Sequence, residues 1–304
     1  ALTWRAVFLA LLPIVAVAGL MTIPQLSRAA PAATGADEAP WPERRRWPRL
    51  ARLDRRALAL LLIAGTTAVL AASNGLPVPV AVPLVALGAP LALVAFLQLV
   101  PPGTVRLAPG MPAAVMVRGI LTFAFFGTDA YVSLTFQDVR GQATWVAGAA
   151  LTAATVTWTT GAWIQERLIH RVGPRALIGA GFALVLAGIG GMLGALGPLP
   201  VPVAILVWGL AGLGTGLSYS PLSVTVLGYA EPGREGAASS SLQLSDVLGI
   251  SLGTGASGAF VAIGESSGWA LRSALTAAFA VTAVVAAVGI LAARRLPADL
   301  PRAG

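Results

Sequence analysis

Long apolar stretches alternate with short polar segments along the whole chain. A helix needs about 20 mostly apolar residues to cross the hydrocarbon core of a bilayer. Stretches of about that length without charge clusters predict about nine transmembrane helices, which makes the expected fold an all-α polytopic membrane helix bundle. The second stretch is the shortest, because a Ser-Asn-Gly turn signal follows it. The nine stretches cover residues 6–26, 57–73, 80–100, 113–136, 144–164, 176–197, 203–229, 238–263 and 270–293.

Residues 27–56 form the one long polar segment, which is rich in proline, alanine and arginine and has PWPERRRWP at its centre. We interpret it as a cytoplasmic linker on anionic headgroups, where each arginine contributes about 1 kcal/mol and the tryptophans anchor at the interface. An ordinary solvated linker fits the same composition.

The charge balance fits a membrane topology. The chain has 304 residues, 57% of them hydrophobic and 11% charged, with a mean hydropathy of +0.82 and a net charge of +8. All 20 cations are arginines. If the first span runs from outside to inside, only Arg5, Arg140 and Arg272 lie outside, which agrees with the excess of positive charge in cytoplasmic loops. The basic balance therefore requires no nucleic-acid partner.

The composition also excludes several chemistries. The chain has no cysteine and no lysine, and its one histidine is His170. Disulfides, thiolate metal sites and lysine Schiff bases are therefore excluded, and we expect no metal and no cofactor. Residues 249–258 match both G-x-S-x-G and G-x-G-x-x-G. We reject nucleotide binding, because the match lies within a span and no strand precedes it, and we reject a hydrolase, because no base lies nearby. We therefore expect that the protein is not an enzyme.

Three ionisable residues lie inside predicted spans, namely Arg118, Asp129 and Asp246. Charges there are costly and usually functional. Arg118 and Asp129 share a helix face but are separated by about 16 Å of rise, so they cannot pair directly. Gln243 and Asp246 lie on one stripe of the eighth span. We interpret these four residues as candidates for proton coupling or for lining a substrate cavity, with Asp129 first. Alternatively, Asp246 is a satisfied packing residue and Arg118 snorkels to the cytoplasmic surface.

Small residues and a proline mark the seventh and eighth spans. Gly212, Gly216, Gly249 and Gly253 allow helix backbones to approach closely in lipid. Pro221 interrupts the seventh span and predicts a kink, either in a helix that rocks or lines a cavity or as an inert feature.

Four segments carry a resemblance to a known family. Residues 4–13 match Trp-Arg-x-x-Phe-x-x-x-x-Pro, and residues 136–141 look like the family's Gln-containing outer loop. Residues 161–175 are similar to its Gly-x-x-x-Asp-Arg-x-Gly-Arg cytoplasmic loop, and residues 231–253 to a later loop and helix. In this order, the chain resembles the later part, from helix six onward, of the fourteen-helix drug:proton antiporter branch of the major facilitator superfamily.

The resemblance implies a domain organisation. Residues 1–26 would be a helix of a missing N-terminal half, 27–56 a linker, 57–100 two inserted helices, 113–293 a major-facilitator-like six-helix second half and 294–304 a cytoplasmic tail. It also implies a gating loop, in which His170 stands where relatives carry an acid. The gating candidates are Gly161, Arg167, His170, Arg171, Gly173 and Arg175.

The function that the resemblance implies is proton-coupled efflux of small amphipathic molecules by alternating access. Its partners would be the small-molecule substrate, protons, the lipid bilayer and the missing half. The alternative is a non-transporting truncated half or a membrane assembly module. The absence of lysine suggests a GC-rich bacterial genome, so we place the protein in the bacterial cytoplasmic membrane.

Overall fold

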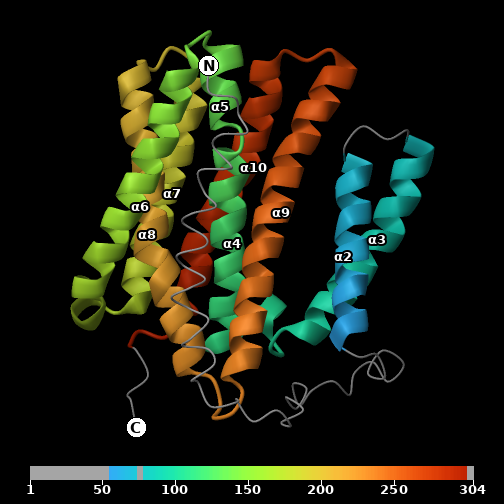
Figure 1. Cartoon of the computed structure of the whole chain (residues 1–304), viewed down its shortest axis with the longest axis vertical. Coiled ribbons are helices and arrows are strands. Elements are labelled where there is room, and N and C mark those ends of the chain that lie inside the picture. The colour runs from blue at the N-terminus through green and yellow to red at the C-terminus, as the bar shows by residue number, and fades with distance from the viewer. Residues whose placement is uncertain (1–54, 74–77, 300–304) are drawn as a thin grey trace, which may run out of the picture. The chain divides into compact units, whose positions relative to one another are not determined.

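The computed structural model describes residues 55–73 and 78–299, all of which belong to one compact unit spanning residues 40–304. These residues are almost entirely helical and include no strand. The first predicted span, 6–26, and residues 27–54 of the predicted linker lie outside the described residues. Within them, the structure confirms a polytopic helical bundle (Figure 1).

Every span predicted between residues 57 and 293 falls on helix. The elements are α2 (Arg55–Ser73), α3 (Val78–Leu99), η2 (Thr104–Arg106), α4 (Met111–Asp129), α5 (Val132–Leu134), the π-helix η3 (Thr135–Val139), α6 (Thr144–Val172), α7 (Pro174–Ala195), α8 (Val201–Gly228), α9 (Glu235–Ser267) and α10 (Leu271–Ala293).

Six helical segments of the described chain are long and apolar enough to cross a membrane. They are Val82–Leu99, Met111–Val139, Pro174–Ala195, Val201–Gly228, Glu235–Ser267 and Leu271–Ala293. The other two predicted spans differ for separate reasons. The apolar part of α2, Arg56–Ala71, is short, whereas α6 has 29 residues but contains many threonines and ends in charged turns.

Close backbone contacts organise the bundle. α8 packs extensively against both α6 and α7, while α4 packs against α9. A Cβ atom at Gly212 or Gly216 would overlap backbone atoms of α6, and one at Gly249 or Gly253 would overlap backbone atoms of α4. These glycines therefore set how closely the helix axes approach, which brings polar side chains of α4, α8 and α9 within reach of one another.

The segment predicted as a gating loop is mostly helix. The helix that begins at Thr144 therefore extends beyond residue 164, where the predicted span ends. α6 continues to Val172, and the single residue Gly173, with φ of +81°, separates it from α7. Residues 162–172 contain no proline or glycine, and His170 and Arg171 in the last turn interact favourably with the negative end of the helix dipole. Pro174 then starts α7, where its missing N–H costs nothing.

The span predicted at residues 113–136 is divided. α4 ends at Asp129, and the chain continues through the short α5 into the π-helix η3. Asp129 therefore lies at the last position of α4. π-helical turns are rare and often occur at functional sites.

Candidate functional site

A buried ion pair joins α4 to α9. Arg118 Nε donates a hydrogen bond to Asp246 Oδ1 at 2.8 Å, and the two side chains are only 4% and 5% exposed. The residues are 128 positions apart in sequence. The positions of the two residues along their helices allow this contact. Arg118 lies 7 residues, or about 10 Å, from the start of α4, and Asp246 lies 11 residues, or about 16 Å, from the start of α9.

Tyr219 of α8 completes this charge network. Its hydroxyl donates to Asp246 Oδ2 at 2.8 Å, while its carbonyl accepts a hydrogen bond from Arg118 at 2.6 Å. The Arg118 guanidinium lies 3.0 Å from the centre of the Tyr219 ring, and Ser223 Oγ is a further acceptor at 3.4 Å. Both carboxylate oxygens are therefore satisfied, and the cation is paired, hydrogen-bonded and stacked on a π face. We call Arg118, Asp246 and Tyr219 the charge network.

The charge network differs from the sequence-based picture in two respects. The alternative in which Arg118 snorkels to the surface is wrong, because the side chain is buried against α8 and α9. Sequence reasoning also missed Tyr219. The signal available was its position two residues before Pro221 within an apolar helix, and that signal does not identify its partners.

Asp129 occupies a separate place. It is half-buried at the end of α4 and forms no ion pair with any described residue. Its carboxylate interacts electrostatically with the indole of Trp208, whose buried Nε1 makes no hydrogen bond of ordinary geometry. The adjacent Thr128 shares a hydrogen bond with Thr282 of α10 at 2.8 Å, which fixes the last turn of α4.

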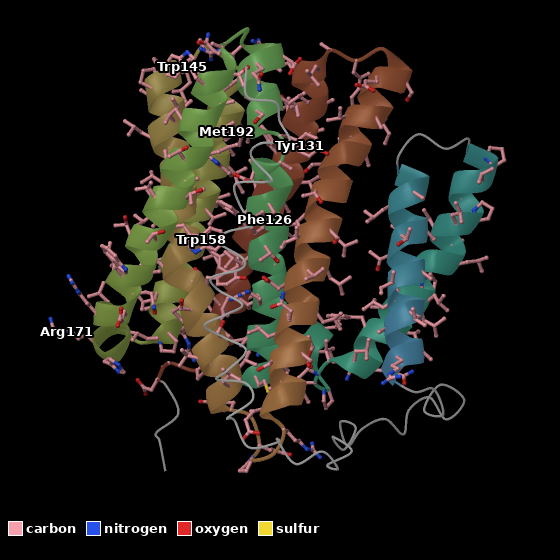
Figure 2. All side chains as sticks on the ribbon, viewed as in Figure 1. Phe126, Tyr131, Trp145, Trp158, Arg171 and Met192 are labelled. Atoms are coloured by element: carbon pink, nitrogen blue, oxygen red, sulfur yellow. The ribbon has the colours of Figure 1, made fainter. Side chains whose placement is uncertain are left out.

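A row of aromatic rings runs between Asp129 and the charge network. Trp208 stacks on Phe125 at 5.3 Å between ring centres, Phe125 meets Trp158 edge-on at 5.5 Å, and Trp158 lies 5.2 Å from Tyr219. Phe126 of α4 and Trp158 of α6, both labelled in Figure 2, are partly exposed, and their ring centres lie 6.2 Å apart. The row offers an apolar, polarisable surface that ends in a carboxylate on one side and in the charge network on the other.

The other candidates lie apart from the charge network. Gln243 is exposed although it shares a stripe with Asp246. Arg167, His170 and Arg171 are exposed on the last turns of α6. Arg175 donates from Nε to the carbonyl of Leu296, just beyond α10, at 2.6 Å.

Gly161 and Pro221 are buried at helix positions within α6 and α8. A Cβ atom at Gly161 would overlap the carbonyl of Leu213 in α8.

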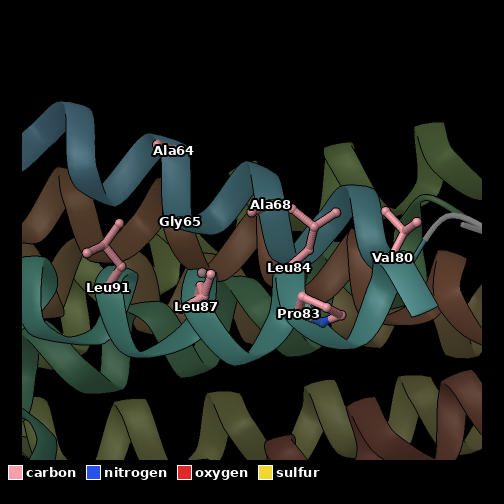
Figure 3. Close-up of a pocket in the computed structure, with 9 residues that line it drawn as sticks. Ala64, Gly65, Ala68, Val80, Pro83, Leu84, Leu87 and Leu91 are labelled. Atoms are coloured by element: carbon pink, nitrogen blue, oxygen red, sulfur yellow. The ribbon is translucent and has the colours of Figure 1, made fainter. Parts of the chain in front are cut away.

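A groove of about 390 Å³ between α2 and α3 is lined by apolar residues alone (Figure 3). Another of about 390 Å³ involves these helices with α4 and α9 and includes Thr66 and Ser245. No cluster of three metal-ligating side chains occurs among the described residues.

Six long apolar helices and a buried charge network define a multi-pass helical membrane protein. No family model matches the chain. It is similar to the methylenomycin A resistance protein of Streptomyces coelicolor, with 26% identity over 188 residues. The matched stretch covers 62% of this chain and 39% of that protein, so it spans well under half of the relative's length.

Proposed function

We propose that this chain is part of a proton-coupled transporter of the major facilitator type that exports small amphipathic molecules across the bacterial cytoplasmic membrane. The observation that carries the proposal is the charge network, in which α4, α8 and α9 place a buried ion pair inside an apolar bundle. Ionisable groups at such positions are expensive and are usually retained for function. The similarity to a resistance protein supports the same conclusion.

The two carboxylates suit different roles. Asp246 is held by Arg118 and Tyr219, so a change in its charge would strand a buried cation. Asp129 has no cationic partner among the described residues and is only half-buried, so it can gain and lose a proton without breaking an ion pair. We therefore assign proton coupling to Asp129 and a helix-joining role to the charge network.

The aromatic row suits an amphipathic substrate. The partly exposed rings of Phe126 and Trp158 can pack against the apolar part of a small molecule, while Asp129 lies close to the far end of the row. Protonation of Asp129 and occupancy of the row would then compete, which is the requirement for exchanging a proton for a substrate. Arg175, at the α6–α7 turn, would help to hold one access state through its bond to Leu296.

Replacement of Asp129 tests the proposal. In everted membrane vesicles containing the full-length transporter, Asp129→Asn should abolish substrate movement driven by a proton gradient. It should leave substrate binding measurable, because asparagine keeps the size of the side chain. Asp138→Asn is the matched control, since Asp138 is an exposed carboxylate on the nearby π-helix. Proton-driven transport that survives Asp129→Asn at the level of this control would refute the assignment.

A second candidate function is a non-transporting half or an assembly module. Alternating access in this family type requires two bundles that rock around a shared site. Reconstitution of this chain alone in liposomes distinguishes the candidates, because substrate-dependent transport by the isolated chain would eliminate the module.

A further inference from the structure

The segment that follows α10 folds back onto the turn between α6 and α7. Arg175 Nε donates to the Leu296 carbonyl at 2.6 Å, and Leu296 itself is fully buried in the core. The Ala298 carbonyl occupies the space where a side chain at Gly173 would lie. Backbone bonds from residues 294, 295 and 296 to 291, 292 and 293 form the tight turn that starts this return. Residues 294–299 are therefore docked on the α6–α7 turn, and we call this contact the C-terminal clasp.

The C-terminal clasp brings two groups of arginines to the same end of the bundle. One group follows the last turns of α6 and the start of α7, and the other directly follows α10. All five side chains are exposed, and Figure 2 shows Arg171 projecting away from the bundle. We call these five residues the basic rim, which consists of Arg167, Arg171, Arg175, Arg294 and Arg295.

Within the part of the chain that the structure describes, no carboxylate forms an ion pair with the basic rim. The two segments 166–175 and 294–299 hold five arginines and His170 against only Glu166 and Asp299. The ion pairs found within the described chain are Arg118–Asp246 and Arg234–Glu231, and neither includes a member of the basic rim. Guanidinium groups without a carboxylate partner among the described residues gather at this end of an apolar bundle, where lipid phosphates are available. Guanidinium groups bind phosphate oxygens through paired, charge-assisted hydrogen bonds.

We propose that the C-terminal clasp assembles the basic rim into a binding site for the headgroup of an anionic phospholipid. Neither segment alone presents the whole rim, so headgroup binding should depend both on the arginines and on the clasp. The site lies at the end of the bundle that the arginine distribution predicts to face the cytoplasm. Binding there would hold α6, α7 and α10 together at one end. This inference is independent of the transported substrate and of proton coupling.

Lipid titration tests the charge part of the proposal. Short-chain phosphatidylglycerol is titrated calorimetrically into the full chain in mild neutral detergent, with phosphatidylcholine of the same chain length for comparison. Phosphatidylglycerol should bind more tightly. The double variant Arg171→Gln/Arg294→Gln should weaken that binding about 30-fold, from the usual contribution of two surface arginines. The control Arg106→Gln/Arg272→Gln removes two exposed arginines elsewhere and should change it little.

A glycine pair tests the role of the clasp. Gly173→Ala places a methyl group against the Ala298 carbonyl at a residue with φ of +81°, so it should open the clasp and weaken phosphatidylglycerol binding without changing any charge. Gly233→Ala introduces similar backbone strain, at φ of +82°, but its methyl group meets no atom within 4 Å, so binding should be retained. Far-ultraviolet circular dichroism and gel filtration check that each variant is folded.

Four results would overturn the proposal. Equal binding of the two lipids would remove the preference for an anionic headgroup. A loss in the double variant no larger than in its control would show that the basic rim is not the site, and this readout remains available if Gly173→Ala does not fold. Binding of soluble glycerol phosphate as tight as that of phosphatidylglycerol would assign the rim to a free phosphate compound instead. Equal binding by the two folded glycine variants would show that the clasp does not assemble the site.

Discussion

Removal of one partner from the charge network should destabilise the bundle severely. In Asp246→Leu, the guanidinium of Arg118 stays buried, at 4% side-chain exposure, without its carboxylate. An uncompensated buried charge of this kind costs about 3–5 kcal/mol. Arg118 keeps its bonds to the Tyr219 carbonyl and Ser223, so we expect a loss near the lower end, about 3 kcal/mol.

The double variant Arg118→Met/Asp246→Leu separates the ion pair from the cost of stranding one charge. It fills the same space with apolar atoms and leaves no buried charge, so it should be more stable than either single variant. Tyr219→Phe removes only the hydroxyl bond to Asp246 Oδ2 and should cost about 1.5 kcal/mol, the lower value for a hydrogen bond to a charged group, because Tyr219 is partly exposed.

Unfolding by sodium dodecyl sulfate from mild-detergent micelles, followed by circular dichroism, measures these differences. The full chain, both single variants and the double variant form a double-mutant cycle. A strong coupling between the two positions is expected, because they form one ion pair. The reasoning would be refuted if Asp246→Leu unfolded at the same detergent fraction as the original chain. Losses in the double variant equal to the sum of the single losses would refute it as well.

Two further predictions concern contacts between helices and can be checked by thermal unfolding in the same micelles. Gly249→Ala should lower the free energy of unfolding by about 1–3 kcal/mol, because its methyl group would overlap the backbone of α4. The control Gly190→Ala adds a methyl group that meets no atom within 4 Å and should be neutral. Equal melting temperatures for the two variants would contradict the close α4–α9 packing. Arg140→Ala should lower the free energy of unfolding by about 2 kcal/mol, because Arg140 donates to three carbonyls at and just beyond the end of α7. Arg272→Ala, which removes an exposed arginine on the same predicted side, should change it little. An unchanged melting temperature for Arg140→Ala would show that water replaces those bonds without loss.

Hydropathy located the helices because each transmembrane segment must satisfy its own backbone within the segment. That constraint is local, so spans such as 176–197 and 270–293 could be predicted closely from the sequence alone. The ends of helices could not be predicted from hydropathy where polar residues continue a helix beyond its apolar part. The polar end of α6 looked like a loop, yet it stays helical up to Gly173, because polar residues do not break a helix that extends beyond the apolar region.

Only the tertiary structure determined which side chains contact one another. The sequence placed Arg118 and Asp246 inside spans and marked both as costly, which was enough to single them out. It could not join residues 128 positions apart, because the rotation and depth of α4 against α9 are set by the glycine contacts between them. Tyr219 and the C-terminal clasp were missed for the same reason. Helix periodicity determines which residues share a face, whereas only packing determines what that face contacts.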